Sequence, residues 1–273
     1  MIKLLALDMD GTLLDEDKKI SPENKEAIHQ AVQQGVRLVL CTGRPIMGVR
    51  PYFEELELPS TEDEYVIINN GCTTLKTSDW SLVDWRQLSS DDLRFLYDTV
   101  KHSSVQLTVF DEDRYIVVGE PASDLVTYDA GLVFSKPVEL SLEETLAGAH
   151  NFQAMFLDQP DSLDTFEQEQ GAKLSQRFST VRSQPYIYEA MPSGTTKASA
   201  LQSLTQKLGF TSDQVMAIGD AANDLEMLQY AGLGIAMGNA SSAIKEQADD
   251  ITDDNQHNGV ATAIKRYILK ENK

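Results

Sequence analysis

The sequence predicts an α/β fold, in which helices cover a parallel sheet and a smaller α+β domain is inserted into the chain. Short apolar runs without helical periodicity end in polar residues and glycine, a pattern typical of parallel strands buried on both faces. Amphipathic segments separate these runs, and this alternation over short links indicates right-handed strand–helix–strand units. Over residues 85–187 short strands and helices mix without such glycine-ended runs. We therefore expect a discontinuous core at residues 1–84 and 188–273, and an inserted domain at residues 85–187.

The first 84 residues carry the signals for three strands and two helices of the core. One helix is expected to begin at Pro22, which suits a first helical turn, and to end at Gly35. A second helix is expected to begin at Pro45 and to run towards Leu58 with a kink at Pro51. The strands, each followed by polar residues, are predicted at residues 4–7, 36–41 and 65–68.

The insert and the C-terminal segment are interpreted in the same way. In the insert, helices are predicted at residues 89–102, 142–149 and 162–170, and strands at residues 106–109, 115–118, 153–157, 174–181 and 186–190. Core character resumes after Pro192, with a helix from Lys197 to Gly209. The remaining core elements are predicted as strands at residues 215–218 and 233–237, a short strand at Ile251, and helices at residues 225–232 and 260–269.

Composition and charge narrow the classes of partner. The formal net charge of −20 over 273 residues argues against binding to nucleic acid or to an anionic membrane surface. Cys41 and Cys72 end apolar runs and make no disulfide framework, so a reducing compartment is the simplest setting. The chain reaches Asp8 too early for a signal peptide, and no apolar run is long enough to span a bilayer. We expect a cytoplasmic protein with no membrane partner; the pattern does not indicate its oligomeric state.

The polar residues that follow the predicted strands form one candidate site. Asp8 and Asp10 follow the first strand, and two neighbouring carboxylates are costly unless a cation such as Mg²⁺ joins them. Ligands in open α/β sheets bind beyond the carboxyl ends of the strands, so the other strand ends are expected to share this crevice. A hydroxyl, backbone N–H groups at helix starts and one lysine then describe a phosphate site. These further residues are Thr42, Gly43, Arg44, Asn69, Asn70, Lys197, Asp220, Asn223 and Asp224.

This set resembles the haloacid dehalogenase (HAD) superfamily, whose hallmarks are Asp-x-Asp-Gly-Thr, Thr/Ser, Lys and Gly-Asp-x-x-Asn-Asp. The details Thr-Gly-Arg-Pro at residues 42–45, Asn-Asn-Gly at 69–71 and Gly-Ile-Ala-Met-Gly-Asn at 234–239 are similar to its Cof-type branch of sugar-phosphatase-like enzymes. The resemblance covers both core segments. It implies a Rossmann-like core, and it accounts for the insert as an α/β cap of the C2B kind.

The resemblance also implies a chemical role for each matching position. Asp8 would be the nucleophile and form an aspartyl phosphate, and Asp10 would protonate the leaving oxygen and then activate water. Mg²⁺ would be held by the carboxylates of Asp8 and Asp220 and the backbone carbonyl of Asp10, with Asn223 and Asp224 in support. The groups that would contact the phosphoryl group or the rest of the substrate come from Met9, Thr42, Gly43, Arg44, Asn70, Lys197 and Asn223.

Three functions remain open at this point. The first is a Mg²⁺-dependent phosphatase for small phosphorylated metabolites, with sugar phosphates expected because of the branch that the chain resembles. The second is a phosphomutase on hexose phosphates, which needs the same residues and a cap that excludes water. The third is a non-catalytic sugar-phosphate-binding protein; it predicts loss of Asp8, Asp10 or Lys197, and all three are present.

Overall fold

The computed structural model describes residues 1–58 and 64–270, and the described chain divides into two compact units. The first unit comprises Met1–Gly43, Tyr52–Asp84 and the chain from Thr196 onward, and the second comprises Arg44–Pro51 and Trp85–Thr195. The junctions around the insert thus fall after Asp84 and after Thr195, where the sequence suggested residues 84 and 187. Arg44–Pro51 packs with the second unit, although its neighbours along the chain on both sides belong to the first.

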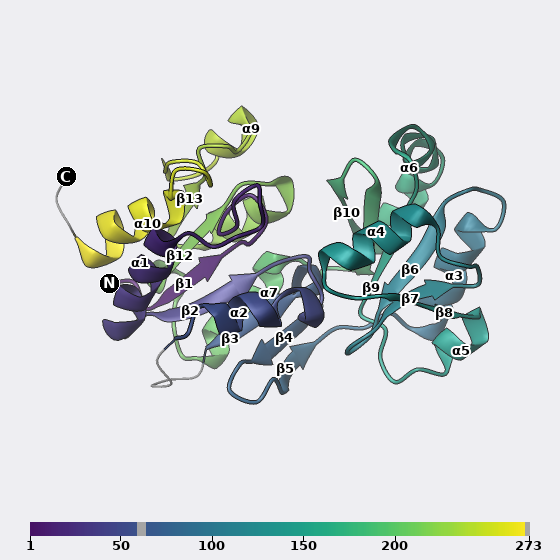
Figure 1. Cartoon of the computed structure of the whole chain (residues 1–273), viewed down its shortest axis with the longest axis horizontal. Coiled ribbons are helices and arrows are strands. Elements are labelled where there is room, and N and C mark those ends of the chain that lie inside the picture. Colours follow the sequence, from purple (N-terminus) through teal and green to yellow (C-terminus); the bar gives the residue numbers. More distant parts are fainter. Residues whose placement is uncertain (59–63, 271–273) are drawn as a thin grey trace. The chain divides into compact units, whose positions relative to one another are not determined.

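An eight-stranded sheet forms the centre of the first unit, in the order β14-β13-β12-β1-β2-β3-β4-β5 (Figure 1). Its strands are β1 (Leu4–Leu7), β2 (Arg37–Cys41), β3 (Tyr65–Ile68), β4 (Thr73–Lys76), β5 (Leu82–Trp85), β12 (Val215–Gly219), β13 (Leu233–Ala236) and β14 (Asp250–Ile251). β1 pairs in parallel with both β2 and β12, so the carboxyl ends of these three strands lie at one edge. β4 pairs antiparallel with β3. The predicted parallel α/β core is confirmed.

Helices cover the sheet of the first unit. They are α1 (Pro22–Gln33), α7 (Lys197–Lys207), α8 (Leu225–Tyr230), α9 (Ser242–Lys245) and α10 (Gly259–Ile264), and α2 (Arg50–Glu55) crosses the division between the units. Apolar side chains of α7 and α8 pack with Leu4 and Ala6 of β1 in one buried cluster. α1 lies against α10 (Figure 1), and the Asn24 side chain accepts a hydrogen bond of 2.9 Å from the backbone N–H of Ala261.

The second unit is built on a separate six-stranded sheet, in the order β10-β11-β9-β6-β7-β8. Its strands are β6 (Gln106–Phe110), β7 (Tyr115–Val118), β8 (Pro137–Leu140), β9 (Gln153–Leu157), β10 (Phe178–Gln184) and β11 (Ile187–Pro192), and its helices are α3 (Ser90–Val100), α4 (Asp124–Leu132), α5 (Leu142–Leu146) and α6 (Pro160–Ser175). α3 and α6 pack on Leu107, Val109 and Phe156. α4 packs on Tyr115 and Met155, which alternate with those residues along the strands and so face the other side.

Several elements differ from their sequence-based predictions. The strand expected at residues 174–181 is wrong in its first part: α6 runs to Ser175, because Leu163, Phe166 and Leu174 continue one buried helical stripe. The helix expected from Pro45 to Leu58 is a short 3₁₀ turn at Ile46–Gly48 followed by α2. α4, β4, β5, β8 and α9 were not predicted.

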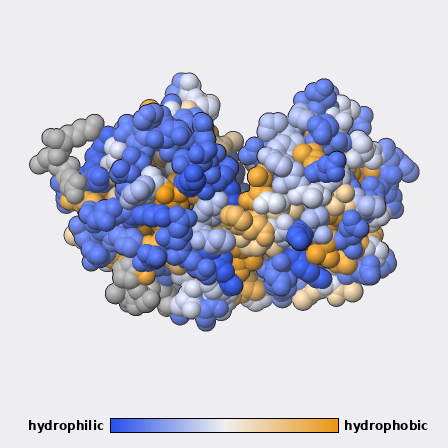
Figure 2. Space-filling view, in the orientation of Figure 1, coloured by the Kyte–Doolittle hydropathy of each residue, from blue (hydrophilic) through white to orange (hydrophobic). Residues whose placement is uncertain are grey.

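No helix within the described residues has the length and apolar composition that crossing a bilayer requires. In the space-filling view most of the visible surface of each unit is hydrophilic (Figure 2). This agrees with the high net negative charge of the sequence.

Candidate active site

A buried cluster of one ammonium and two carboxylates lies at the carboxyl edge of the first sheet. Lys197 Nζ donates to Asp8 Oδ1 over 2.6 Å and to Asp224 Oδ1 over 2.7 Å. Asp8 directly follows β1, Lys197 begins α7, and Asp224 lies just beyond β12. Their relative exposures are 4%, 2% and 0%, so the charges are shielded from water and depend on each other for stabilisation. Three sequence-predicted residues therefore meet at one point.

The start of α7 is fixed by its cap and by a close backbone contact. Thr196 is the N-cap, and its side chain accepts a hydrogen bond of 3.1 Å from the N–H of Ser199. Gly71 has φ +98°, and a Cβ there would lie 2.3 Å from the carbonyl oxygen of Thr196. Only glycine allows the loop after β3 to approach this closely. The contact sets the position from which Lys197 enters the cluster.

Asp224 holds the lysine and also shapes the turn after β12. Its Oδ2 accepts hydrogen bonds of 3.1 Å from the backbone N–H groups of Asp220 and Ala221. Since Oδ1 bonds to Lys197, both oxygens of Asp224 have partners. This arrangement agrees with the supporting role expected of Asp224.

Asp220 is fixed by two side chains that the sequence-based site did not include. Thr12 Oγ1 donates to Asp220 Oδ1 over 3.1 Å, and Asn239 Nδ2 approaches Asp220 Oδ2 at 3.3 Å. Asn239 Nδ2 also donates to the carbonyl of Gly11 over 2.8 Å, which ties the loop after β13 to the loop after β1. Both residues lie within the motifs that carried the resemblance, so the signal was available, although no role was assigned to them.

The cluster carries more negative than positive charge. Burial, followed by the negative charge of Asp224, raises the pKa of Asp8 well above its usual value, although Lys197 opposes this shift. The same two causes raise the pKa of Asp220 to about 6. For Lys197, burial alone would lower the pKa, but Asp224 and Asp8 outweigh it and raise the pKa above the ordinary value. A further cation would relieve the remaining repulsion between the carboxylates.

The donor set fits a hard divalent cation. Asp8, Asp220 and Asp224 each offer a carboxylate oxygen, and these oxygens lie within 4.8 Å of one another. Carboxylate oxygens are the ligands that Mg²⁺ prefers in proteins. Because Asp224 is occupied by Lys197 and two N–H groups, Asp8 and Asp220 are the better placed of the three to hold the ion.

The raised pKa of Asp220 predicts a pH dependence of Mg²⁺ affinity. Below about pH 6 this carboxyl retains a proton that Mg²⁺ must displace, so the affinity falls as the pH decreases and is full at higher pH. We expect a loss of up to about tenfold per pH unit between about pH 6 and pH 5, measured by calorimetric titration with Mg²⁺. Asp220→Asn should abolish the binding at every pH. An affinity independent of pH over this range would contradict the prediction.

Asp10 and Met9 lie in the turn that follows Asp8. The carboxylate of Asp10 bonds to Lys18 Nζ over 2.7 Å, and its side chain is 33% exposed. A partly exposed carboxylate can exchange protons with solvent, which suits a general acid. Met9 is fully buried, and its carbonyl accepts hydrogen bonds from Thr12 and Leu14, which close the turn.

The loops after β2 and β3 are joined by hydrogen bonds within the first unit. The N–H of Thr42 donates to the carbonyl of Ile67 over 2.8 Å, and the N–H of Asn70 donates to the carbonyl of Thr42 over 3.0 Å. Asn223 Nδ2 donates to Asn70 Oδ1 over 3.1 Å. A Cβ on Gly43 would lie only 3.1 Å from the Asn70 amide. Thr42, Gly43, Asn70 and Asn223 thus form a second connected group at the same sheet edge.

Arg44 packs with the second unit. Its guanidinium Nη1 donates to the carbonyl of Leu132 over 3.3 Å and lies 3.5 Å from the carbonyl of Gly48, and the residue is 8% exposed. Leu132 is the last residue of α4. The carbonyls at this end of a helix lack partners within the helix, and they stabilise a positive charge nearby. These two contacts tie the Arg44 guanidinium to carbonyls of the second unit.

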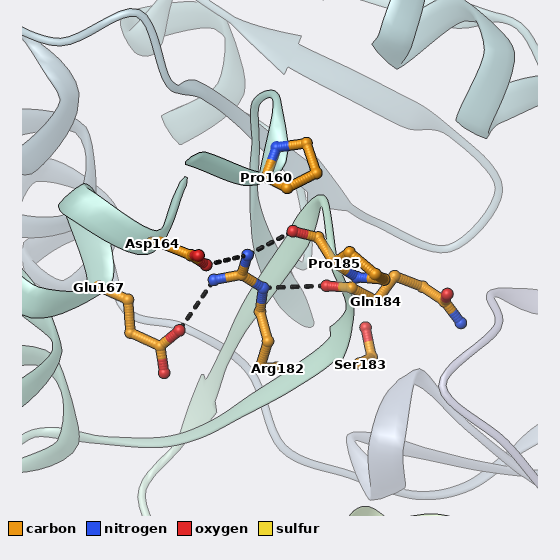
Figure 3. A pocket seen from close by; sticks show the side chains of 7 residues that line it. All are labelled: Pro160, Asp164, Glu167, Arg182, Ser183, Gln184 and Pro185. Atoms are coloured by element: carbon orange, nitrogen blue, oxygen red, sulfur yellow. Dashed lines mark hydrogen bonds and ion pairs between the residues drawn. The ribbon is translucent and has the colours of Figure 1, made fainter. Parts of the chain in front are cut away.

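A separate pocket of about 400 Å³ in the second unit contains none of the sequence-predicted site residues. Figure 3 shows the Arg182 guanidinium pointing between Asp164 and Glu167 and towards the carbonyls of Gln184 and Pro185. Through these four contacts Arg182 connects the β10–β11 hairpin to α6. With two carboxylates beside its cation, the pocket does not suit a phosphate group.

Comparison with known proteins decides the family. The model of the family described as haloacid dehalogenase-like hydrolase matches residues 5–264. The chain belongs to the haloacid dehalogenase-like hydrolases. The family and the enzyme class expected from the motifs are thereby confirmed, and the protein is a hydrolase that acts on phosphate monoesters.

Two bacterial phosphatases match this hydrolase over nearly the whole length of both chains. It is 36% identical to the putative phosphatase YxeH of Bacillus subtilis (strain 168) over 98% of this chain and 99% of the relative. It is 34% identical to the 5-amino-6-(5-phospho-D-ribitylamino)uracil phosphatase YcsE of the same organism, over 98% of this chain and 96% of that one. Among solved structures, a haloacid dehalogenase-like hydrolase from Bacteroides thetaiotaomicron superposes with a TM-score of 0.88, 31% identity, and coverage of 97% of this chain and 99% of that one.

Proposed function

We propose that the protein is a Mg²⁺-dependent phosphatase of small metabolites, that it prefers sugar phosphates and related polyol phosphates, and that it works through an acyl phosphate on Asp8. The observation that carries the proposal is the buried cluster in which Lys197 holds Asp8 and Asp224. A carboxylate beside an ammonium, at the carboxyl end of a central strand, is placed to attack a bound phosphoryl group. Mg²⁺, when bound, supplies positive charge beside Asp8 and the phosphoryl oxygens.

The first chemical step uses Asp8 and Asp10. The Asp8 carboxylate attacks phosphorus while the bond from phosphorus to the leaving oxygen breaks, and Asp10 gives its proton to that oxygen. Lys197 and the Thr42 hydroxyl stabilise the charge on the equatorial oxygens, together with the N–H groups of the loops around Met9 and Gly43. An alcohol leaves and a phosphoryl group remains on Asp8.

The second step returns the enzyme to its starting state. Asp10, now ionised, accepts a proton from water as the water oxygen attacks phosphorus, and inorganic phosphate leaves. Asp8 is regenerated as a carboxylate held by Lys197.

The chemistry of the leaving group supports the proposed substrate class. YcsE is named for a substrate in which phosphate esterifies a ribityl chain, which is a polyhydroxylated alcohol. Sugar phosphates share this ester of a poorly acidic alcohol, and such a leaving group needs the proton that Asp10 carries. We also propose a cytoplasmic location, where such metabolites occur.

The proposal is tested by phosphate release from a panel of sugar phosphates, ribityl phosphates and p-nitrophenyl phosphate, with and without Mg²⁺. Turnover that requires Mg²⁺ and is fastest for the polyol esters supports it. Interconversion of hexose 1- and 6-phosphates without phosphate release would instead show a phosphomutase. Binding of sugar phosphates without turnover would show a non-catalytic protein.

The role of Asp10 predicts a dependence on the leaving group. Asp10→Asn should lower kcat/KM for a sugar phosphate by about 10²- to 10⁴-fold, because an alkoxide cannot leave without a proton. The effect on kcat/KM for p-nitrophenyl phosphate should be much smaller, because its leaving group is already acidic. Asp17→Asn is the matched control, since Asp17 lies in the same loop with a side chain that is 81% exposed. Equal losses for the two substrates would contradict the assignment of Asp10 as general acid.

A further inference from the structure

Two asparagine side chains join three loops at the carboxyl edge of the first sheet. Asn255, in the loop after β14, donates from its side-chain Nδ2 to the carbonyl of Leu14, in the loop after β1, over 2.9 Å. Its backbone N–H donates to Asn239 Oδ1, in the loop after β13, over 3.2 Å. All three residues belong to the first unit. We call Asn239 and Asn255 the asparagine bridge.

The partners of Asn239 determine which way its amide group faces. A backbone N–H can only donate, so the N–H of Asn255 fixes the position of Oδ1. The amide nitrogen then faces the Gly11 carbonyl, to which it donates over 2.8 Å, and Asp220 Oδ2, which lies 3.3 Å away. A carbonyl and an ionised carboxylate can only accept, so all three contacts require the same orientation of the amide. The loop after β14 thus orients a side chain that touches the metal site.

The Asp220 carboxylate is held on both of its oxygens and packs against the turn after β1. Thr12 Oγ1 donates to Oδ1 over 3.1 Å, and Asn239 Nδ2 lies next to Oδ2. A Cβ on Gly11 would lie only 2.4 Å from Asp220 Oδ2, so the backbone of the turn is in direct contact with the carboxylate. The orientation of the carboxylate and the position of the turn therefore depend on each other.

The loop after β14 is itself fixed to its neighbours. The N–H of Gly238 donates to the carbonyl of Asp253 over 3.0 Å, and a Cβ on Gly238 would lie 2.7 Å from the backbone nitrogen of Asp254. On the other side, Thr262 Oγ1 of α10 donates to Asp253 Oδ2 over 2.8 Å. Asn255 therefore holds its two partners from a fixed position.

We propose that the asparagine bridge positions the Asp220 carboxylate and the backbone carbonyl of Asp10 for Mg²⁺, and thereby sets the Mg²⁺ affinity of the site. The proposal rests on the proposed function, because it takes these two groups as ligands of the ion. Gly11 follows Asp10 directly, so the bond from Asn239 to the Gly11 carbonyl also restrains the preceding peptide group. Replacing a residue that orients a metal ligand commonly weakens metal binding by about 10- to 100-fold. Asn239 and Asn255 are positioning residues and do not contact the ion.

Calorimetric titration with Mg²⁺, in the absence of substrate, tests the bridge. Asn239→Ala should weaken Mg²⁺ binding by about 10- to 100-fold, because Asp220 loses the group beside Oδ2. Asn255→Ala should weaken it by about tenfold, because it keeps the backbone N–H but removes the tie to Leu14. If Asn239→Ala does not fold, Asn255→Ala carries the test. A Mg²⁺ affinity equal to that of the wild type in the folded variant would overturn the bridge.

A control variant and a double variant sharpen this titration. Gln256→Ala removes an exposed amide from the same loop and should bind Mg²⁺ as the wild type does. Because Asn255 reaches Asp220 through Asn239, adding Asn255→Ala to Asn239→Ala should weaken binding by at most about a further twofold. A double variant whose loss equals the product of the two single losses would overturn the bridge, since the residues would then act independently.

Hydrogen exchange and kinetics distinguish the bridge from a merely structural contact. Without Mg²⁺, the amides of Thr12 and Leu14, which donate to the Met9 carbonyl, should exchange at least about fivefold faster in Asn239→Ala, while those of β2 stay protected. At saturating Mg²⁺ the kcat of Asn239→Ala should return to within about threefold of the wild type. Unchanged exchange, or a loss of kcat that persists at saturating Mg²⁺, would overturn the bridge. A wild type that binds Mg²⁺ but releases no phosphate would refute the proposed function, and the affinities would still decide the bridge.

Discussion

Replacing Asp8 with asparagine is expected to reduce kcat by at least about 10⁴-fold, because the amide cannot form the acyl phosphate on which both chemical steps depend. The substitution keeps the shape of the side chain, and Lys197 retains its bond to Asp224. Since burial and Asp224 raise the pKa of Asp8, the ionised carboxylate is unfavourable in the folded state. The melting temperature in Mg²⁺-free buffer should therefore not fall. Steady-state kinetics and a thermal melt of the same preparation measure both effects.

This pairing of lost activity with retained stability distinguishes a nucleophile from a structural residue. A variant that loses activity and stability together would show that Asp8 is mainly a partner of Lys197. A variant that keeps activity within about tenfold of the wild type would contradict the assigned nucleophile.

Replacing Lys197 with methionine is expected to affect activity and stability together. It leaves Asp8 and Asp224 buried without their common cation, which should lower the free energy of unfolding by about 3 kcal/mol in the absence of Mg²⁺. It also removes a positive charge from the transferring phosphoryl group, and kcat should fall by about 10³-fold. Denaturant titration and kinetics at saturating Mg²⁺ measure the two losses.

Lys207→Met is the matched control for this variant. Lys207 lies at the other end of α7, and its ammonium donates to the carbonyl of Val83 in an exposed setting. We expect a loss of less than about 1 kcal/mol and no loss of kcat. If the two variants were equally stable and equally active, the Lys197 cluster would not be the centre of the site.

The core of the site was predictable because it follows from sheet geometry. Asp8, Thr42 and Asp220 follow strands that are parallel neighbours, so any correct assignment of those strands places the three residues at one edge. Lys197 required more information, because nothing in the sequence around a helix start indicates what its first residue faces. The resemblance supplied that information, and the structure brings Lys197 into the cluster.

The hydrogen bond between Arg44 and the end of α4 was not predictable from the sequence. The partner residue Leu132 lies 88 residues away and contributes a backbone carbonyl, which leaves no trace in residue type. α4 itself was not predicted, because its buried residues, Val126, Asp129 and Ala130, do not form a continuous apolar stripe and its exposed face includes Tyr128. A contact with a helix cannot be predicted from the sequence when the helix itself shows no apolar periodicity.

The measurement that tests the central claim most directly is detection of the phosphoryl group on Asp8. The enzyme is mixed with a sugar phosphate and Mg²⁺, quenched in acid during the first turnover, and digested for mass spectrometry. We expect the peptide that contains Asp8 to carry one added phosphoryl group, which appears before steady state and is absent from Asp8→Asn. Phosphate release without any label on Asp8 would contradict the account, because water would then attack the substrate directly.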